Sequence, residues 1–547
     1  LIWLALWPAL QRGELLAVVT TDAGCGLATG GRSWIVPTEQ VAVTLAALAW
    51  DGPRWLWWRA RDCRLLPLRP RTCWDLGAVH QVLHGGRRND PAAVWAAAHG
   101  LAQPEEPGGE LALFDRGGRA LEGDPADPVR ADGTLRPEWT AGPPPDPARW
   151  AALALDVQTR QEAALRALPD PRPRPLDPPL ALLTAYAESA AALLAVELEH
   201  DGLPVDRAVA EALVGAQLGP RPGSTRQVRD APVLALLPTD LRNPALVRAA
   251  LLRLGIDVPD TRSWRLEAYR GAHPAVEALL AWRKVERTAT TYGYGWLDTQ
   301  VSADGRLRGA WTSADGGAGR MTALAGLHSL PAELRPAVVA EAGHVLVRAD
   351  LGQVEPRVLA AVSGDSGLAG AAKADDMYTP VADALRCDRP TAKVAVLAAM
   401  YGQTSGAAGR ALEQMERAYP IALAFLRTAE QAGREGRDVR THGGRLVRVG
   451  SGGAGRFARN AVVQGAAAEL FKAWAASVRT GLGADGGRIV LCLHDELLLH
   501  VPLARADAAA RLLHAALAET AARWASGCGV RFVAEVAVMA RWSDAKA

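Results

Sequence analysis

The chain has 547 residues, of which 49% are hydrophobic and 22% are charged. This composition is ordinary for a soluble protein, and the length exceeds what one compact core accommodates, so several domains are expected. The net charge is only +2, so bulk charge gives no argument for a nucleic-acid partner. Lysine occurs at five positions only, and the abundance of Arg, Ala, Gly and Pro indicates GC-rich coding.

The cysteines and the apolar segments exclude several further classes. The six cysteines form no CxxC pair and have no histidine at zinc-finger spacing, so neither a zinc knuckle nor a disulfide framework is indicated. The longest apolar stretches, such as 41–50, are shorter than the roughly 20 residues that a membrane helix needs. No basic and then apolar leader opens the sequence. We expect a cytoplasmic protein with no membrane partner.

The first third of the chain predicts a small α/β domain. Residues 1–140 combine short β-like runs at 15–20, 34–36 and 55–58 with alanine-rich helical runs. Residues 141–180 are rich in proline around a helical segment at 150–168, which predicts a linker or domain edge.

The pattern changes twice more along the chain. Residues 181–310 are mostly helical, with apolar residues three and four apart at 182–198 and 276–285. Beyond 310, short β runs at 345–347, 439–449, 489–493 and 497–501 alternate with long helices. The residues that can carry chemistry lie in this last part.

Two acidic residues follow apolar strands in this part of the chain. Asp350 ends a predicted buried strand and precedes a helix, and Asp495 lies at the tip of a predicted hairpin between 489–493 and 497–501. Acids on neighbouring strands can hold two Mg²⁺ ions about 3.5–4 Å apart, the arrangement used for nucleotidyl transfer. Taken alone, an Asp after an apolar strand usually caps the next helix, and His-Asp-Glu often forms a solvated turn.

A helix between these acids repeats a pattern at every fourth residue. Arg389, Lys393, Leu397 and Tyr401 would lie along one face, where two cations could grip phosphates and Lys393 could protonate a pyrophosphate leaving group. Leu397 and Tyr401 could stack against base and sugar. An amphipathic helix with a solvated basic end is the alternative.

The order and spacing of these motifs resemble the A-family DNA polymerases of the DNA polymerase I type. The resemblance runs from about residue 180 to 547 and rests on three motifs: Asp350 with Gln353, Glu355 and Arg357; Arg389 with Lys393, Tyr401 and Gly402; and His494, Asp495 and Glu496. It implies a multidomain α/β and α+β fold, a right-hand polymerase with palm, fingers and thumb. The implied parts are the palm start and thumb (181–310), the palm with the first catalytic Asp (311–365), the fingers (366–455) and the palm with the second (456–547).

The resemblance also implies roles for individual residues. Asp350 and Asp495, with Lys393, would be catalytic, and Asp350, Leu351 and Asp495 would hold two Mg²⁺ ions. Glu355 would be the steric gate against ribose, backed by Tyr401. The nucleotide-binding set would be Gln353, Glu355, Arg389, Lys393, Leu397, Tyr401 and His494, and the DNA-binding set Arg320, His328, Arg357, Arg456, Asn460, Gln464 and Glu496.

Some positions depart from the family pattern. Leu351 and Leu397 stand where aromatic residues are usual, and Gly326, Leu327 and His328 replace the usual Asn-Leu-Gln. Several of these features resemble the actinobacterial group labelled bifunctional 3′-5′ exonuclease/DNA polymerase. The departures also motivate an alternative function, a non-catalytic primer-template-binding protein derived from a polymerase.

In the resemblance, residues 1–140 correspond to a ribonuclease-H-like exonuclease domain that needs an Asp-x-Glu and two further Asp residues. Asp22 has no Glu following at that spacing, Asp75 is a lone acid, and Asp156 lacks a Tyr or His four residues before it. We therefore expect a degenerate, inactive exonuclease-like domain. The predicted function is primer extension with deoxynucleoside triphosphates in replication or repair gap filling, by a monomer associated with the nucleoid of a bacterium.

Overall fold

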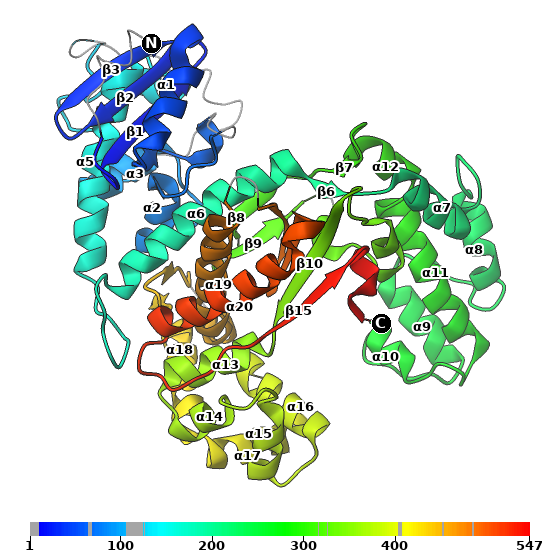
Figure 1. The fold of residues 1–547 in the computed structure, drawn as a ribbon. Coiled ribbons are helices and arrows are strands. Elements are labelled where there is room, and N and C mark those ends of the chain that lie inside the picture. Colours follow the sequence, from blue (N-terminus) through cyan, green and yellow to red (C-terminus); the bar gives the residue numbers. More distant parts are fainter. Residues whose placement is uncertain are drawn as a thin grey trace. The chain divides into compact units, whose positions relative to one another are not determined.

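The structure is a computed structural model that describes residues 10–63, 68–104, 124, 126–315, 317–324, 326–402, 407–450, 453–483 and 486–546. The chain divides into two compact units. The first comprises Leu1–His200, Trp311–Thr322 and Val347–Val538, and the second comprises Asp201–Ala310, Ala323–Leu346 and Met539–Ala547. Figure 1 colours both units by sequence.

The N-terminal part of the first unit is a five-stranded sheet in the order β3-β2-β1-β4-β5. Its antiparallel strands are β1 (Leu15–Thr21), β2 (Gly24–Thr29) and β3 (Arg32–Pro37), and β4 (Arg54–Trp57) and β5 (Cys73–Asp75) continue it in parallel to β1. The helices of this part are α1 (Thr38–Trp50), α2 (Leu76–His84), α3 (Pro91–Ala98) and α4 (Pro137–Thr140). The three β runs expected from the sequence coincide with β1, β3 and β4.

The segment 141–180 is not a free linker. Helix α5 (Pro147–Arg166) begins at the cap residue Asp146, whose carboxylate accepts from two backbone amides. Its buried residues Trp150, Val157 and Leu165 join the same hydrophobic core as Leu56 and Trp74 of the sheet. The proline count predicted a boundary, but the apolar face of α5 makes it part of the N-terminal domain.

Helix α6 (Leu180–Asp201) is long and apolar enough to span a membrane by length and composition, yet 72% of its apolar window is buried inside the protein. Two acidic residues on it are paired there. Glu188 contacts Lys472 at 2.6 Å and Arg445 at 2.6 Å, and Glu197 contacts Arg479 at 2.6 Å. These buried ion pairs are the features of a core helix.

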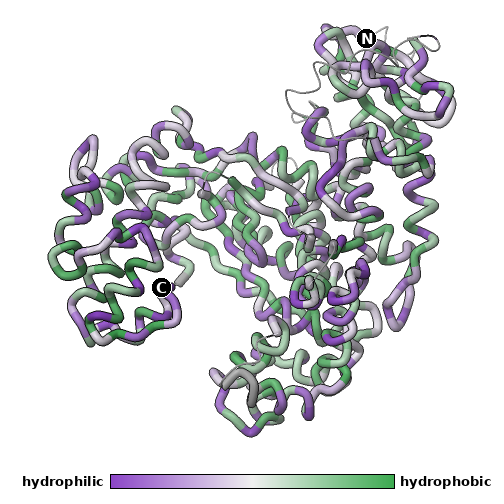
Figure 2. Tube along the Cα trace, turned by 180° about the vertical axis from the view of Figure 1, so that it is seen from behind, coloured by the Kyte–Doolittle hydropathy of each residue, from purple (hydrophilic) through white to green (hydrophobic). Residues whose placement is uncertain are grey.

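The second unit is mainly helical. Its helices are α7 (Arg207–Leu218), α8 (Arg226–Leu234), α9 (Pro244–Arg253), α10 (Ser263–Glu267), α11 (Pro274–Thr291) and α12 (Tyr294–Gln300). Val247, Leu251, Leu279 and Trp282 are part of its core. Hydrophobic and hydrophilic residues alternate along these helices in Figure 2, as expected for amphipathic packing. Strands β6 (Leu203–Pro204) and β7 (Arg306–Leu307) form a short ladder.

The sheet that carries the candidate acids has the order β13-β14-β10-β15. Strands β13 (Arg488–Leu493) and β14 (Glu496–Pro502) form an antiparallel hairpin beside β10 (His344–Leu351), and β15 (Ala534–Met539) is the outer strand on the other side of β10. Helices α19 (Gly455–Leu482) and α20 (Ala506–Trp524) pack on each other and contact β13 and β14 (Figure 1).

The remaining elements of the first unit lie between β10 and α19 in the chain. They are α13 (Val354–Ser363), α14 (Ser366–Ala371), α15 (Tyr378–Leu385), α16 (Arg389–Tyr401), α17 (Ala407–Ala418) and α18 (Pro420–Arg434), followed by β11 (Val439–Arg440) and β12 (Leu446–Val447). Strands β8 (Trp311–Asp315) and β9 (Arg320–Ala323) form a further ladder. Asp388 caps α16, and Gly402 ends it at a φ of 63°, a conformation that favours glycine.

Candidate active site

The structure brings the two predicted catalytic acids to adjacent strands. Leu351, which follows Asp350, donates its backbone N–H to the carbonyl of Asp495 at 2.9 Å. The hairpin register pairs Leu493 with Glu496, so His494 and Asp495 form a two-residue tip, with His494 at a φ of 49°. Asp350 and Asp495 are both half-buried. The tip predicted from the sequence therefore lies beside the end of β10.

The charge of Asp350 acts on Asp495. The pKa of Asp495 is raised to about 6, first by burial and next by the negative charge of Asp350. Burial also raises the pKa of Asp350, as do the charges of Glu496 and Glu535, while Arg348 opposes the rise. The influence of Asp350 on Asp495 requires that the two carboxylates lie close together.

Arg348, which sequence reasoning missed, is the cation of this cluster. Its Nη2 donates to Asp350 Oδ2 and, at 3.0 Å, to Glu496 Oε2. Only 9% of the Arg348 side chain and 10% of the Glu496 side chain are exposed. Alternation along the strand puts residues 348 and 350 on the same face, which was the available signal. Glu496, expected to contact DNA, is instead buried against Arg348.

Glu355 is held by two partners at the start of α13. Its Oε1 contacts Arg320 Nη2 at 2.8 Å, and its Oε2 accepts from the Tyr401 hydroxyl at 2.8 Å. Burial raises the pKa of Tyr401 to about 12, with the charge of Glu355 adding to it. Burial lowers the pKa of His494, and Arg320 and Glu355 are the next influences on it. The pairing of Glu355 with Tyr401 agrees with the arrangement that the family resemblance implies.

A second group links Gln353 to the first turn of α16. Gln353 donates from Nε2 to Asp376 Oδ1 at 2.5 Å and accepts at Oε1 from the Met377 amide at 2.9 Å. Arg389 donates to both oxygens of Asp376, at 2.6 and 3.2 Å, and these bonds lower the pKa of Asp376 to about 2. Asp376 was not singled out from the sequence, where it is one of two adjacent acids without a helical or strand pattern.

The other residues of α16 lie as the four-residue spacing predicts. Lys393 is exposed and Leu397 and Tyr401 are half-buried. Within the described part of the chain, no hydrogen bond or ion pair joins Arg389 or Lys393 to Asp350 or Asp495. Arg389 and Lys393 therefore lie on one helix, and the described contacts do not join them to the two acids.

Three predicted DNA contacts lie at the start of α19, at four-residue spacing. Arg456 is exposed, and Asn460 and Gln464 are half-buried. A hydrogen bond from Gln464 lowers the pKa of Tyr401, so Gln464 adjoins the group around Glu355. His328 belongs to the second unit, where its Nδ1 accepts from the Ala323 amide at 2.9 Å.

The expected DNA contact of Arg357 is corrected by its position. The residue is 0% exposed, and its guanidinium donates to five backbone carbonyls, those of Gly352, Ala372, Ala374, Asp375 and Arg531. A motif match cannot show whether an arginine points outward or inward. Here all of its donors are used inside the protein, and Arg357 is an anchor of the fold.

Two acids of the N-terminal domain, Asp75 on β5 and Asp156 on α5, have hydrogen-bond and ion-pair partners close by. Asp75 is buried and accepts from Trp57 Nε1 at 3.0 Å, the Ala60 amide at 2.6 Å and the Ala78 amide at 2.7 Å. Burial raises its pKa to about 6. Asp156 contacts His99 at 2.8 Å and Arg160 at 3.0 Å. Each of these acids therefore has local structural partners.

The acid pair fits a divalent cation better than any other group. Asp350 and Asp495 offer carboxylate oxygens, the ligands that Mg²⁺ prefers, and their pKa values are raised first by burial and then by neighbouring carboxylates, whose charge a cation would offset. The side chain of Leu351 is buried, so only its backbone could take part.

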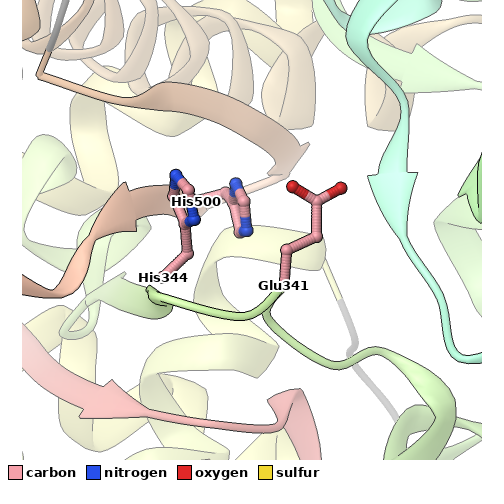
Figure 3. Close-up of side chains that lie close together, drawn as sticks. All are labelled: Glu341, His344 and His500. Atoms are coloured by element: carbon pink, nitrogen blue, oxygen red, sulfur yellow. The ribbon is translucent and has the colours of Figure 1, made fainter.

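Figure 3 draws a different group of side chains with metal-ligating atoms. Glu341 and His344 come from the segment that begins β10, and His500 comes from β14. Glu341 and His344 belong to the second unit and His500 to the first. Glu341 is paired with Arg306 at 2.5 Å, and we assign no ion to these residues. The six cysteines are all free.

The fold matches a solved polymerase. Over 100% of this chain and 98% of the other, it is similar to the POL domain of Pol1 from M. smegmatis in complex with DNA primer-template and dNTP, with a TM-score of 0.67 and 19% identity. The architecture is therefore that of a polymerase domain.

The family follows from the sequence comparisons. The family model for DNA polymerase family A matches residues 255–544, and the chain belongs to DNA polymerase family A. It is 31% identical over 320 residues to the thermostable DNA polymerase I of Thermus thermophilus, covering 51% of this chain and 38% of that enzyme. The DNA polymerase I of Chloroflexus aurantiacus is 29% identical over 286 residues, 45% of this chain and 30% of that enzyme. The chain thus aligns with well under half the length of these relatives.

Proposed function

We propose that this protein is a template-directed DNA polymerase that adds deoxynucleoside triphosphates to the 3′ end of a primer. The observation that carries the proposal is the juxtaposition of Asp350 and Asp495 on adjacent strands, in a chain of family A. An acid whose pKa is raised by burial and by the charge of a neighbouring acid, in a half-buried site, is typical of a catalytic centre for divalent metal ions.

Asp350 and Asp495 would hold two Mg²⁺ ions, with the Leu351 backbone as a further candidate ligand. When bound, such ions lower the pKa of the primer hydroxyl and offset charge on the pyrophosphate leaving group. The carboxylates themselves must be ionised to serve, and the close approach of the two strands keeps them in register.

The triphosphate would be bound by the exposed basic face of α16. Arg389 and Lys393 would supply positive charge, and Lys393, one turn along the helix, would donate a proton to the leaving group. The Asp376 carboxylate holds Arg389 and Gln353 in fixed positions. Leu397 and Tyr401 would contact base and sugar, and His494 would approach the same nucleotide from the hairpin tip.

Glu355 would act as the gate against ribose. Its carboxylate is fixed between Arg320 and Tyr401, so an added 2′-hydroxyl would meet a charged, already bonded group. Arg320, Arg456, Asn460 and Gln464 would contact primer-template through acceptors that all base pairs share in the minor groove. Such contacts would test base-pair shape and not sequence.

The N-terminal domain would be a ribonuclease-H-like exonuclease that no longer cleaves. Asp75 accepts three hydrogen bonds, from an indole and two backbone amides, one of which caps α2, and these bonds would keep its carboxylate in a structural role. The ion pairs of Asp156 support the same inference. The protein would belong to the actinobacterial group named above, act as a monomer at the bacterial nucleoid and serve replication or repair gap filling.

Primer extension on a gel, with primer-template affinity measured in parallel, tests the proposal. The wild-type chain is expected to extend a primer with Mg²⁺ and deoxynucleotides, and Asp350→Asn and Asp495→Asn to bind the same DNA without extending it. A wild-type chain that binds primer-template but never extends it would instead support the alternative, a non-catalytic binding protein. The unusual Leu351 and Leu397 motivate that alternative.

A further inference from the structure

We propose that Arg348 is a resident counter-cation of the metal site: it holds Asp350 and Glu496 together before metal binds and lowers the affinity of the site for divalent cations. The inference rests on the proposed function, because it concerns the same carboxylates. It adds a positioning residue that the three sequence motifs do not include.

The geometry places one guanidinium between two carboxylates. Arg348 Nη2 donates to Asp350 Oδ2 and to Glu496 Oε2, the latter at 3.0 Å. Arg348 is on β10, and its acceptors are on β10 and on the neighbouring strand β14. Arg348 thus fixes the position of Asp350, a predicted metal ligand, relative to Glu496. Glu496 directly follows Asp495, the other predicted ligand.

The charge around Arg348 is unbalanced. Glu535, on β15 at the other side of β10, acts on both Arg348 and Asp350. With Asp495, Glu496 and Asp350, four carboxylates surround the cluster. An arginine buried to 9% exposure among them remains protonated and supplies a fixed positive charge.

That charge has two opposite consequences for a divalent cation. Without metal, it offsets the repulsion between the acids and keeps them in place. With metal, it repels the incoming cation over a distance of a few ångströms, and one Asp350 oxygen remains shared with the guanidinium. The site is therefore assembled in advance at the expense of metal affinity.

The test is to measure Mn²⁺ binding to the full chain without DNA or nucleotide. Electron paramagnetic resonance reports the concentration of free Mn²⁺ at each step of the titration. Arg348→Gln is expected to bind Mn²⁺ about tenfold more tightly than wild type, since one nearby positive charge is lost. The melting temperature of this variant without metal is expected to be below that of wild type. Adding Mn²⁺ is expected to raise the melting temperature of the variant by more than it raises that of wild type. An affinity equal to or below that of wild type overturns the proposal.

Arg479→Gln is the matched control. The Arg479 side chain is also 9% exposed and ion-paired, to Glu197 on α6, away from the acid cluster. It is expected to lose stability while its Mn²⁺ affinity stays within about twofold of wild type. If Arg479→Gln tightens Mn²⁺ binding as much as Arg348→Gln, loss of any buried arginine explains the effect and the proposal fails.

Arg348→Lys keeps the charge and decides the matter if the glutamine variant does not fold. It is expected to bind Mn²⁺ within about twofold of wild type. Binding more than about fivefold tighter would show that charge does not limit affinity. Primer extension by the wild-type chain separates the two proposals: extension with unchanged Mn²⁺ affinity in Arg348→Gln refutes only the role of Arg348, whereas Mn²⁺ binding without extension refutes the polymerase function.

Discussion

Asp75 of the N-terminal sheet and Asp495 of the β13–β14 hairpin have pKa values raised to the same level, about 6, yet they are differently partnered. Asp75 is 3% exposed and accepts three hydrogen bonds from an indole and two backbone amides. Asp495 is more exposed, and the next influence after burial is another carboxylate. The raised pKa is therefore common to both acids, and what distinguishes them is their partners: hydrogen-bond donors around Asp75 and a like-charged neighbour beside Asp495.

The largest effect should separate these two acids by activity. Asp350→Asn and Asp495→Asn should each reduce the primer-extension rate by a factor of about 1,000 or more, because each removes a charged ligand from the acid pair. Asp75→Asn is the control and should extend primers within a few-fold of wild type. Single-turnover extension of a labelled primer measures all three. Loss of extension in Asp75→Asn, with the chain still folded, would break the comparison.

The dependence of stability on pH should not separate the two acids, because both pKa values are raised to about 6. The folded-state pKa of Asp75 lies above its usual value, so the folded state binds the proton more tightly than the unfolded state. Its contribution to stability is complete below about pH 4 and is lost as the pH rises through about 6, by about 3 kcal/mol in all. Asp75→Asn should remove the share of this dependence that comes from Asp75 and leave the share that comes from Asp495. Unfolding by urea at pH 4.5 and pH 7 gives the free energy of unfolding of wild type and variant at each pH. The prediction is contradicted if this free energy changes equally between the two pH values in both proteins.

Glu355 is an intermediate case, a half-buried acid with one cation and one phenol as partners. Glu355→Ala should raise ribonucleotide incorporation relative to deoxynucleotide by about ten- to a hundredfold, because the bonded carboxylate no longer meets the 2′-hydroxyl. Competition between the two nucleotides on one template measures the ratio. Tyr401→Phe keeps the acid and should change the ratio less; unchanged sugar selectivity in Glu355→Ala would remove its role as gate.

The smallest expected effect is on the pH dependence of the rate. Because Asp495 must ionise to hold metal, extension at low Mg²⁺ should rise about tenfold between pH 5 and pH 7. More Mg²⁺ should shift this rise to lower pH, since the cation favours the ionised carboxylate. Rates across pH at two Mg²⁺ concentrations give the answer. A rise that does not move with Mg²⁺ would have to come from some other group.

Much of this arrangement could be predicted from the sequence. The apolar runs before Asp350 and around the hairpin predicted β10, β13 and β14, and the four-residue spacing predicted α16. The partners could not be predicted, because Arg348, Asp376 and Glu535 reach their neighbours only through strand pairing and loop closure across the chain. For the same reason the motif match gave Arg357 a surface role, whereas its partners include the carbonyl of Arg531, 174 positions away.

The strand order also has a consequence for synthesis. Both neighbours of β10, strands β14 and β15, follow it by well over a hundred residues, so the strand bearing Asp350 leaves the ribosome long before either edge can be paired. An unpaired apolar strand is prone to wrong pairing. Premature stop codons between β10 and β14 should therefore yield products that aggregate, and chaperones that shield exposed strands should matter most while this part of the chain is being translated.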